Sequence, residues 1–316
     1  MLSVYQLIIP TPYVVGHINA YLINNEPVTL IDVGPQTPEA MKVLREMLSA
    51  LGVGIKNISR IIITHAHPDH CGLVAEIAAM AGATVYVHNW EERKLNGEHD
   101  HLRERLPFVL ESGIPKEMVK KMIGQRDKLL HPTLKGVPTR LLYDNQTLDF
   151  DQGSLQVMHL PGHSPGHVCL YDPEQRFFFS GDFLLPHITP NPLLEPDPER
   201  PGQRVPALKQ YLQGLDRVEV LDIALVFPGH GGLFNDYRTV INAGRQHHLT
   251  QFRQIKNKLQ AGEMNSYQLS RVIYPGLKGW NIFLGISEIQ AHLDLLVEKG
   301  EIFCRQRQGV NYYSLS

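Results

Sequence analysis

The sequence has few cysteines and almost no net charge, and both shortages narrow the classes of protein it can belong to. Its 316 residues include only three cysteines, Cys71, Cys169 and Cys304, and their spacing matches neither a metal-binding nor a redox motif. We therefore expect no fold that depends on disulfide bonds. We expect the protein to lie in a reducing compartment, the cytoplasm. The formal net charge is −2, so no overall electrostatic attraction to nucleic acid or to an anionic membrane is predicted.

Long hydrophobic runs are lacking as well. The apolar stretch near the N-terminus is broken by Pro10 and Pro12, well short of the roughly 20 residues that a helix needs to span a bilayer. No basic segment precedes it, so we expect strands there instead of a signal peptide or an anchor, and no membrane partner. Hydrophobic residues make up 43% of the chain, which is enough to bury the core of one large domain and a smaller one.

Strand and helix patterns alternate along most of the chain. Residues 4–10, 18–24 and 28–34 are short runs rich in Val, Ile, Leu and Tyr, separated by turn residues, and they predict consecutive strands. A helical pattern at 37–52 follows, and later segments repeat the order of strands and then helices. This order favours an α/β (α+β) fold in which two sheets pack face to face with helices outside. A polar, helical stretch at about 91–140 predicts an inserted cap.

The last part of the chain has a different pattern. Three helical segments and a terminal hairpin follow residue 249, which is typical of a winged helix. We therefore divide the chain into a catalytic domain, 1–249, and a winged-helix-like domain, 250–316. Residues 261–316 contain five basic and five acidic residues, whereas nucleic-acid binders concentrate basic side chains on one face. Nucleic acid is a possible partner but not the favoured one, and we expect this module to pack, dimerise or close a pocket.

The segment THAHPDH, residues 64–70, ends the buried-strand pattern RIIIT and carries three histidines and an aspartate. His65 and His67 alternate along the chain and can converge on one cation, while Asp69 and His70 on the next turn can reach a second. Imidazole and carboxylate together suit zinc or a similar first-row metal better than calcium. The segment therefore predicts a metal site.

Three later segments supply further candidate ligands, namely His163 in PGHSPGH, Asp182 in FSGD and His230 in FPGHG. Each is a polar residue beside glycine that closes an apolar strand, and glycine lets the backbone bend tightly near a metal. Taken singly, a loop histidine is more often structural than a ligand. Taken with the first cluster, the shared position at strand ends favours a single metal centre.

Three residues are candidates for supporting roles. Asp32 ends a strand where its carboxylate could orient a ligand histidine, although a turn aspartate capping the next helix fits as well. His167 could form a hydrogen bond near the site or face solvent. His187 enters a proline-rich loop after the strand that carries Asp182, and loops at strand ends commonly line substrate pockets.

The ordered set THAHPDH, GHSPGH, SGD and PGHG resembles the metallo-β-lactamase superfamily, and the resemblance spans residues 4 to about 245. It implies an αββα sandwich with metals at one edge of the facing sheets. The branch that the chain resembles includes glyoxalase II, lactonases and endoribonucleases. Over its whole length, winged helix included, it is most similar to the lactamase-like family that contains a single-strand endoribonuclease. The implied ligands are His65, His67 and His163 for one metal, Asp69, His70 and His230 for the other, and Asp182 as the bridge.

This resemblance implies an enzyme that holds two divalent metal ions, with zinc expected and manganese or iron also compatible. Such a pair of ions activates a bridging hydroxide for hydrolysis, and we assign Asp69 and Asp182 to the catalytic set. The expected substrate is a small ester, thioester or lactone, and a homodimer is compatible with the sequence. Two alternatives stay open: an endoribonuclease acting on single-stranded RNA, and a mononuclear iron enzyme like the persulfide dioxygenases.

Overall fold

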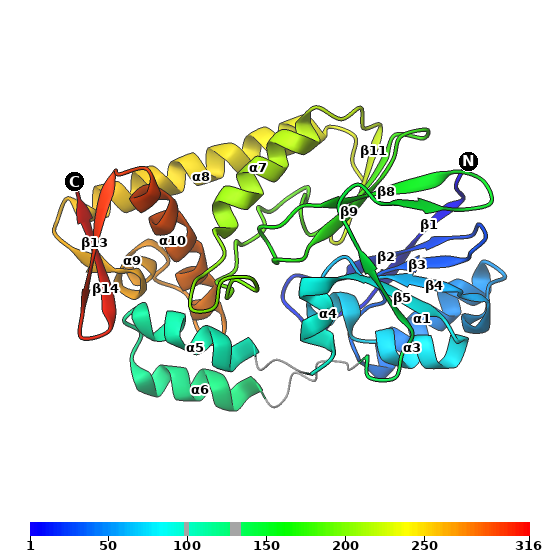
Figure 1. The fold of residues 1–316 in the computed structure, drawn as a ribbon, viewed down its shortest axis with the longest axis horizontal. Helices are drawn as coiled ribbons and strands as arrows, with labels where there is room; N and C mark the ends of the chain where they lie inside the picture. The colour runs from blue at the N-terminus through cyan, green and yellow to red at the C-terminus, as the bar shows by residue number, and fades with distance from the viewer. Residues whose placement is uncertain (98–100, 127–133) are drawn as a thin grey trace.

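Two β-sheets packed face to face form the centre of the larger part of the molecule (Figure 1). The computed structural model describes residues 1–97, 101–126 and 134–316. In the first sheet the strands lie in sequence order, antiparallel from β1 to β3 and parallel from β3 to β6. They are β1 (Val4–Ile9), β2 (Ile18–Ile23), β3 (Thr29–Ile31), β4 (Arg60–Ile62), β5 (Thr84–His88) and β6 (Thr139–Leu142).

The second sheet has the order β11-β10-β9-β8-β7. Neighbouring strands are antiparallel except β10 and β11, which run parallel because helix α7 (Ala207–Glu219) lies between them in the chain. The strands are β7 (Thr147–Asp149), β8 (Ser154–His159), β9 (Val168–Asp172), β10 (Phe177–Gly181) and β11 (Leu225–Pro228).

The alternation of side chains along each strand explains why the first sheet is buried on both faces. In β4, Ile61 joins the core beneath the outer helices, while its neighbour Ile62 faces the second sheet. There it shares a core with residues of the other sheet such as Val157 and Phe179. The inner parallel strands β4 and β5 are therefore mostly apolar along their length instead of alternating strictly with polar residues.

Helices cover the outer faces of both sheets. On the first sheet lie α1 (Pro38–Ala50), which begins at the N-cap Thr37, the 3₁₀ turn η1 (Ile55–Asn57) and α3 (Val74–Ala81). Helix α7 and the start of α8 (Tyr237–Leu259) pack on the second sheet. The resulting order of helix, sheet, sheet and helix confirms the predicted fold class.

The described residues of the predicted cap include the helices α4, α5 and α6, which lie against different parts of the molecule. Helix α4 (Asn89–Leu95) stays beside β5, whereas α5 (His101–Glu111) and α6 (Lys116–Arg126) lie against the C-terminal part of the chain (Figure 1). Residues 98–100 and 127–133 of the cap lie outside the described residues. Strand β6 ends the cap region by returning to the first sheet.

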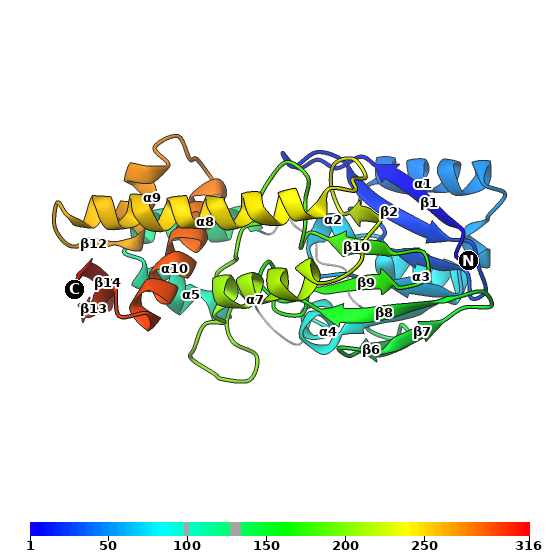
Figure 2. The same cartoon turned by 90° about the horizontal axis from the view of Figure 1, so that it is seen from above.

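Helix α8 connects the sandwich to the C-terminal module as one continuous element (Figure 2). It passes through residue 250, so the boundary placed there falls inside a helix. The module continues with β12 (Met264–Asn265), α9 (Ser266–Ile273), α10 (Asn281–Glu298), β13 (Ile302–Arg307) and β14 (Val310–Leu315), and its strands pair in the order β12-β14-β13. We propose the winged-helix assignment for this module on the basis of that element order.

An apolar cluster joins the cap, the proline-rich loop and α10. Phe108 and Val109 of α5 pack with Leu193 of the loop and with Phe283 and Ile286 of α10. The C-terminal module is thus anchored to the catalytic part by buried apolar surface, the main source of association energy. Among the described residues, no helix is both long and apolar enough to cross a membrane.

Candidate metal centre

The histidines and aspartates singled out in the sequence come together where four strands end. Strand β4 ends just before His65, β8 before His163, β10 before Asp182 and β11 before His230. Asp69 and His70 lie within α2 (Pro68–Cys71), a single turn that starts with proline after the extended N-cap His67. The candidate ligands that this arrangement gathers are His65, His67, Asp69, His70, His163, Asp182 and His230.

One group of ligand atoms belongs to three histidines. The Nε2 atom of His65 lies 2.9 Å from Nδ1 of His67, and Nε2 of His163 lies 3.0 Å from the same Nδ1. Ring nitrogens bound to one tetrahedral zinc at about 2.0 Å are about 3.3 Å apart. These spacings are therefore compatible with three ligands of one cation.

A second group contains Asp69, His70 and His230, and Asp182 lies between the two groups. Nε2 of His230 is 3.4 Å from Oδ2 of Asp69. The Oδ1 atom of Asp182 is 3.3 Å from Nε2 of His70, while its Oδ2 is 3.5 Å from Nε2 of His163. The two carboxylate oxygens thus face different groups, as a bridging ligand requires.

Several buried atoms in this cluster have no hydrogen-bond partner. They are Nε2 of His70 and His230 and Oδ1 of Asp182, which face the cluster, and Nε2 of His67, on the other side of its ring from the Nδ1 atom that faces His65 and His163. Buried polar groups in native proteins are nearly always satisfied, and the three unsatisfied atoms that face the cluster belong to the donor types that first-row divalent cations prefer. The residues therefore fit a metal centre.

Burial and neighbouring charges set the protonation of the cluster. Burial, together with the other histidines, lowers the pKa of His65 and His67 well below the usual range, and burial lowers the pKa of His163. Burial raises the pKa of Asp182, but His70, His230 and His163 outweigh it, so the pKa lies well below its usual range. Neutral imidazoles and an ionised carboxylate are the forms that bind metals, and these three histidines and Asp182 meet that condition. His70 differs, because burial lowers its pKa but the carboxylates of Asp182, Asp32 and Asp69 outweigh burial and raise it well above the usual range.

Asp32 contacts His70 at Nδ1, the ring nitrogen opposite the one that faces the other candidate ligands. Its carboxylate accepts hydrogen bonds from Nδ1 of His70 at 2.8 Å and from both the backbone N–H and the hydroxyl of Thr64. Its backbone has a φ of +56°, an uncommon conformation for a residue other than glycine. The following helix is capped by Thr37 instead. Asp32 therefore fixes the tautomer of His70 and leaves its Nε2 facing the other ligands.

His167 is fully buried and supports Asp182. Its Nε2 accepts a hydrogen bond from the backbone N–H of Asp182 at 3.1 Å, and burial lowers its pKa to about 3. Asp182 also needs glycine at position 229, because a Cβ there would lie 2.4 Å from Oδ1 of Asp182. His187 is exposed and lies next to Gly231, at the rim of the cluster.

Glu91 is a supporting residue that the sequence analysis missed. It lies in α4, fully buried, and accepts hydrogen bonds from the backbone N–H groups of Ala66 and Gly166 and from the hydroxyl of Ser164. Its carboxylate also pairs with Lys94 at 3.2 Å. The side chain of Glu91 thus forms hydrogen bonds to both loops that carry the first histidine group. The signal was its position just after β5, at the same sheet edge, but the polar composition of residues 91–140 led us to predict an inserted cap there.

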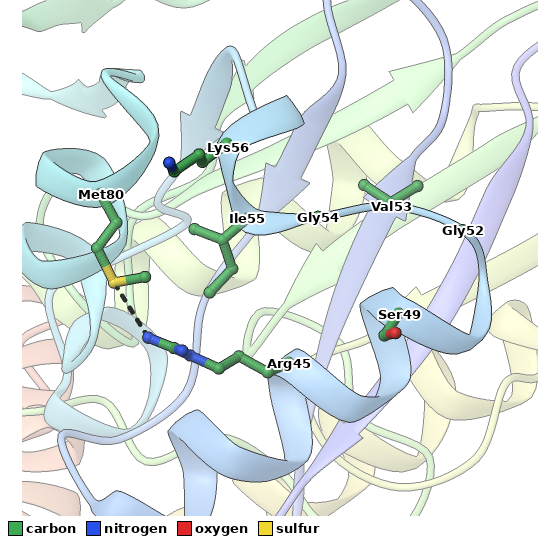
Figure 3. A pocket seen from close by; sticks show the side chains of 8 residues that line it. All are labelled: Arg45, Ser49, Gly52, Val53, Gly54, Ile55, Lys56 and Met80. Atoms are coloured by element: carbon green, nitrogen blue, oxygen red, sulfur yellow. Dashed lines mark hydrogen bonds between the residues drawn. The ribbon is translucent and has the colours of Figure 1, made fainter.

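A surface hollow lies away from the metal cluster. It has a volume of about 540 Å³ and lies between α1 and α3, where Arg45, Lys56 and Met80 line it (Figure 3). None of its lining residues is a histidine or a carboxylate, and none belongs to the metal cluster. We therefore place the chemistry at the histidine cluster and not in this hollow.

Comparison with known proteins shows which chains this one resembles. The family model of the metallo-beta-lactamase superfamily matches residues 13–230. A probable metallo-hydrolase of Bacillus subtilis, YqjP, is 29% identical over 292 residues, which cover 91% of this chain and 90% of the relative. The solved structure of the metallo-beta-lactamase family protein TTHA1429 from Thermus thermophilus matches with a TM-score of 0.84 and 27% identity, covering 99% of this chain and 98% of that one. An acyl-coenzyme A thioesterase of Gallus gallus, MBLAC2, is 47% identical over 47 residues, 15% of this chain and 17% of the relative.

Proposed function

Because the chain belongs to the metallo-beta-lactamase superfamily and is a metal-dependent hydrolase of that family, we propose that it uses two divalent metal ions to cleave a small ester, thioester or lactone. The observation that carries the proposal is the position of Asp182, whose two oxygens face His70 at 3.3 Å and His163 at 3.5 Å. A carboxylate between two histidine groups both spaces two cations and offsets part of their repulsion.

The proposed ligand sets follow from the same contacts. His65, His67 and His163 would hold one ion, Asp69, His70 and His230 the other, and Asp182 would touch both. When bound, a pair of zinc ions lowers the pKa of coordinated water toward 7 and polarises the substrate oxygen. Zinc suits these nitrogen and oxygen donors, and manganese or iron would also be accepted.

The remaining groups hold the ligands in place during the reaction. Asp32 keeps the proton of His70 on Nδ1, and the backbone carbonyl of Asn191 lies 3.1 Å from Nδ1 of His163 and does the same for that ring. Glu91 fixes the two loops that carry the first histidine group. Such support typically changes metal affinity or activity by 10- to 100-fold.

A thioester is the substrate class that the comparisons favour. The partial match to an acyl-coenzyme A thioesterase supports it, although the charge of the metal pair would stabilise the anionic intermediate of any acyl transfer. We propose a small molecule as the partner, and a cytoplasmic location and a homodimer remain proposals from the sequence.

The position of the C-terminal module supports a role in closing the substrate pocket that we propose at the metal centre. Asn191, whose carbonyl contacts His163, also donates a hydrogen bond from its side chain to the carbonyl of Leu284 in α10 at 3.0 Å. Asn191 thus links α10 of the C-terminal module to His163, a proposed ligand. Two of its cations are already engaged, since Arg307 pairs with Glu263 and Lys299 lies over the ring of Phe252. This argues against a free basic face for RNA.

A hydrolysis panel tests the proposal. The protein loaded with zinc, manganese or iron is offered an acyl-coenzyme A, a glutathione thioester, an acyl lactone, bis-p-nitrophenyl phosphate and single-stranded RNA. We expect metal-dependent release of thiol or acid from the acyl substrates and none after chelation. Cleavage of RNA without turnover of any acyl substrate would replace our proposal with the endonuclease alternative.

A further inference from the structure

Four charged side chains form a buried row that leads from the histidine loops to the cap. In order, they are Glu91 and Lys94 of α4, Glu195 of the proline-rich loop and Arg105 of α5. Their side chains are 0%, 10%, 1% and 13% exposed, respectively. The signs alternate, so that each charge faces an opposite one, and we call this set the charge row.

Lys94 is the shared member of the charge row. Its Nζ atom lies 3.2 Å from Oε2 of Glu91 on one side and 3.5 Å from Oε1 of Glu195 on the other. It also donates a hydrogen bond to the hydroxyl of Ser164 at 2.9 Å, and that hydroxyl donates to Glu91 at 2.5 Å. Ser164 directly follows the proposed ligand His163. The ammonium group therefore lies between a loop of the first histidine group and the cap.

Arg105 holds the outer end of the charge row. Its Nε donates to Oε2 of Glu195 at 3.0 Å, and its Nη2 contacts Oε1 of the same carboxylate. Two parallel contacts of this kind fix both the position and the charge of a carboxylate. Burial raises the pKa of Glu195, but Arg105 and Lys94 outweigh burial and lower it below its usual value. Glu195 is therefore ionised.

The two carboxylates of the row compete for Lys94. In the described structure Lys94 is the cation beside Glu91, whereas Glu195 has both Lys94 and Arg105. A buried charge that loses its partner is strongly destabilising, so without Arg105 the single ammonium group would have to serve both carboxylates. It would then move toward Glu195 and away from Glu91 and Ser164. Arg105 thus keeps Lys94 available to the histidine loops.

We propose that Arg105 is a positioning residue of the metal centre, although it lies on the cap. By neutralising Glu195 it leaves Lys94 to Glu91, whose carboxylate accepts hydrogen bonds from both loops of the first histidine group. The inference rests on the proposed function, because it treats the histidines of those loops as metal ligands. Through this contact the cap helix α5 sets the affinity for the first metal ion.

The proline-rich loop has anchors that do not depend on these charges. The backbone N–H of Val205 donates to the carbonyl of Glu195 at 3.1 Å, and the side chain of Asn191 donates to the carbonyl of Leu284 at 3.0 Å. Both contacts remain when the side chains of Arg105 and Glu195 are made neutral. The effect of charge can therefore be separated from the effect of loop anchoring.

Metal affinity in single and double variants tests the proposal. The parent is the full-length Asp69→Ala/His230→Ala protein, in which the first histidine group keeps its proposed ligands, and the visible absorption of Co²⁺ reports binding. We expect Arg105→Met to weaken Co²⁺ binding by about 10-fold, because Lys94 is drawn toward Glu195. Adding Glu195→Gln should restore most of the affinity, since an uncharged side chain no longer attracts the ammonium group. A merely structural ion pair predicts no such rescue.

Arg105→Lys separates charge from shape, and it serves also where Arg105→Met does not fold. It keeps a positive charge beside Glu195 but loses the two parallel contacts. We expect its Co²⁺ affinity to lie close to that of the parent and above that of Arg105→Met. A folded Arg105→Lys protein whose affinity is about 10-fold weaker than that of the parent would contradict the role of charge.

The matched control is the exposed ion pair of Lys120 and Glu117 on α6, whose side chains are 73% and 78% exposed. Lys120→Met, alone or with Glu117→Gln, should leave the Co²⁺ affinity unchanged, and circular dichroism checks the fold of every variant. Parent affinity in Arg105→Met, or a double variant that binds no better than Arg105→Met, would overturn the proposal. The readout is metal affinity and not turnover, so this failure is distinct from a failure of the proposed hydrolysis.

Discussion

Asp32 accepts a hydrogen bond from Nδ1 of His70 at 2.8 Å, and the two side chains are 2% and 0% exposed. The contact joins residues 38 positions apart and turns the other ring nitrogen of His70 toward Asp182. An acceptor-only carboxylate at this place fixes one tautomer of the ring. The orientation of a proposed ligand, His70, thus depends on a residue outside the proposed ligand set.

Replacing Asp32 tests this relationship. We expect Asp32→Asn to lower metal affinity and activity by about 10- to 100-fold, because the amide can offer an N–H to His70 and so no longer fixes the ring. Metal titration of the stripped protein measures the affinity. Asp151→Asn, an exposed change in the turn between β7 and β8, serves as the control. Wild-type affinity in Asp32→Asn would show that His70 is oriented without it.

Asp182 is the second target, because it is the proposed bridge. We expect Asp182→Asn to lose one metal ion per chain and most of the activity while the sheets, and hence the fold, survive. Elemental analysis and circular dichroism measure the two effects. Asp222→Asn removes a carboxylate that is 76% exposed and pairs with Arg176, so it should change neither. An Asp182→Asn protein with full metal content and unchanged turnover would contradict the bridging role.

Glu91→Gln should reduce activity through the positions of the histidine loops. The amide keeps the size of the side chain but loses the negative charge that Lys94 and the N–H groups of Ala66 and Gly166 face. Hydrogen bonds to a charged group are worth about 1.5–3 kcal/mol each, so we also expect a lower free energy of unfolding. Glu92→Gln, which alters the partly exposed neighbour, is the control. Unfolding in urea and steady-state kinetics measure the two effects.

The pH dependence of stability gives a separate test of Glu91. Burial opposes ionisation, but Lys94, Ser164 and the two backbone N–H groups lower its pKa from 4.5 to about 2. A lowered pKa stabilises the fold fully above about pH 4.5, and the stabilisation is lost as the pH falls toward 2. The difference in free energy of unfolding between wild type and Glu91→Gln, both metal-free, should therefore shrink over this range. A constant difference would show that the charge of Glu91 contributes nothing.

The C-terminal module offers a test between small-molecule and RNA substrates. Charge reversal of Lys299, Arg305 and Arg307 should leave hydrolysis of small acyl substrates unchanged, because two of these cations have partners within the module or on α8. A steep salt dependence of binding to single-stranded RNA, abolished by the three reversals, would instead indicate phosphate contacts.

Removing the C-terminal module, unlike the charge reversals, should reduce hydrolysis. Deletion of residues 261–316 would expose apolar side chains that now pack against α10, including Phe108 and Leu193. We expect a loss of solubility and of activity, since exposed apolar patches promote aggregation. Light scattering and turnover measure the two effects. A soluble, fully active truncated protein would show that the module has no part in the pocket.

The sequence by itself determined the fold class and the superfamily. THAHPDH places four candidate ligands between residues 65 and 70, and glycine beside His163, Asp182 and His230 marks where strands end. These signals are local, because alternation and turn residues act over a few positions. Parallel strands bring their ends to one sheet edge, so even the meeting of distant ligands could be expected from the pattern.

The tertiary structure alone decided which side chains support the ligands and where the C-terminal module lies. Glu91 in a charged helix and His248 in a long amphipathic one have sequence surroundings typical of solvent-facing or structural residues, yet both are buried. Their partners, Ala66 and Gly166 for the first and His292 for the second, come from other elements. Burial and such cross-element contacts depend on how layers pack, and packing is the sum of many weak contacts that no short motif encodes.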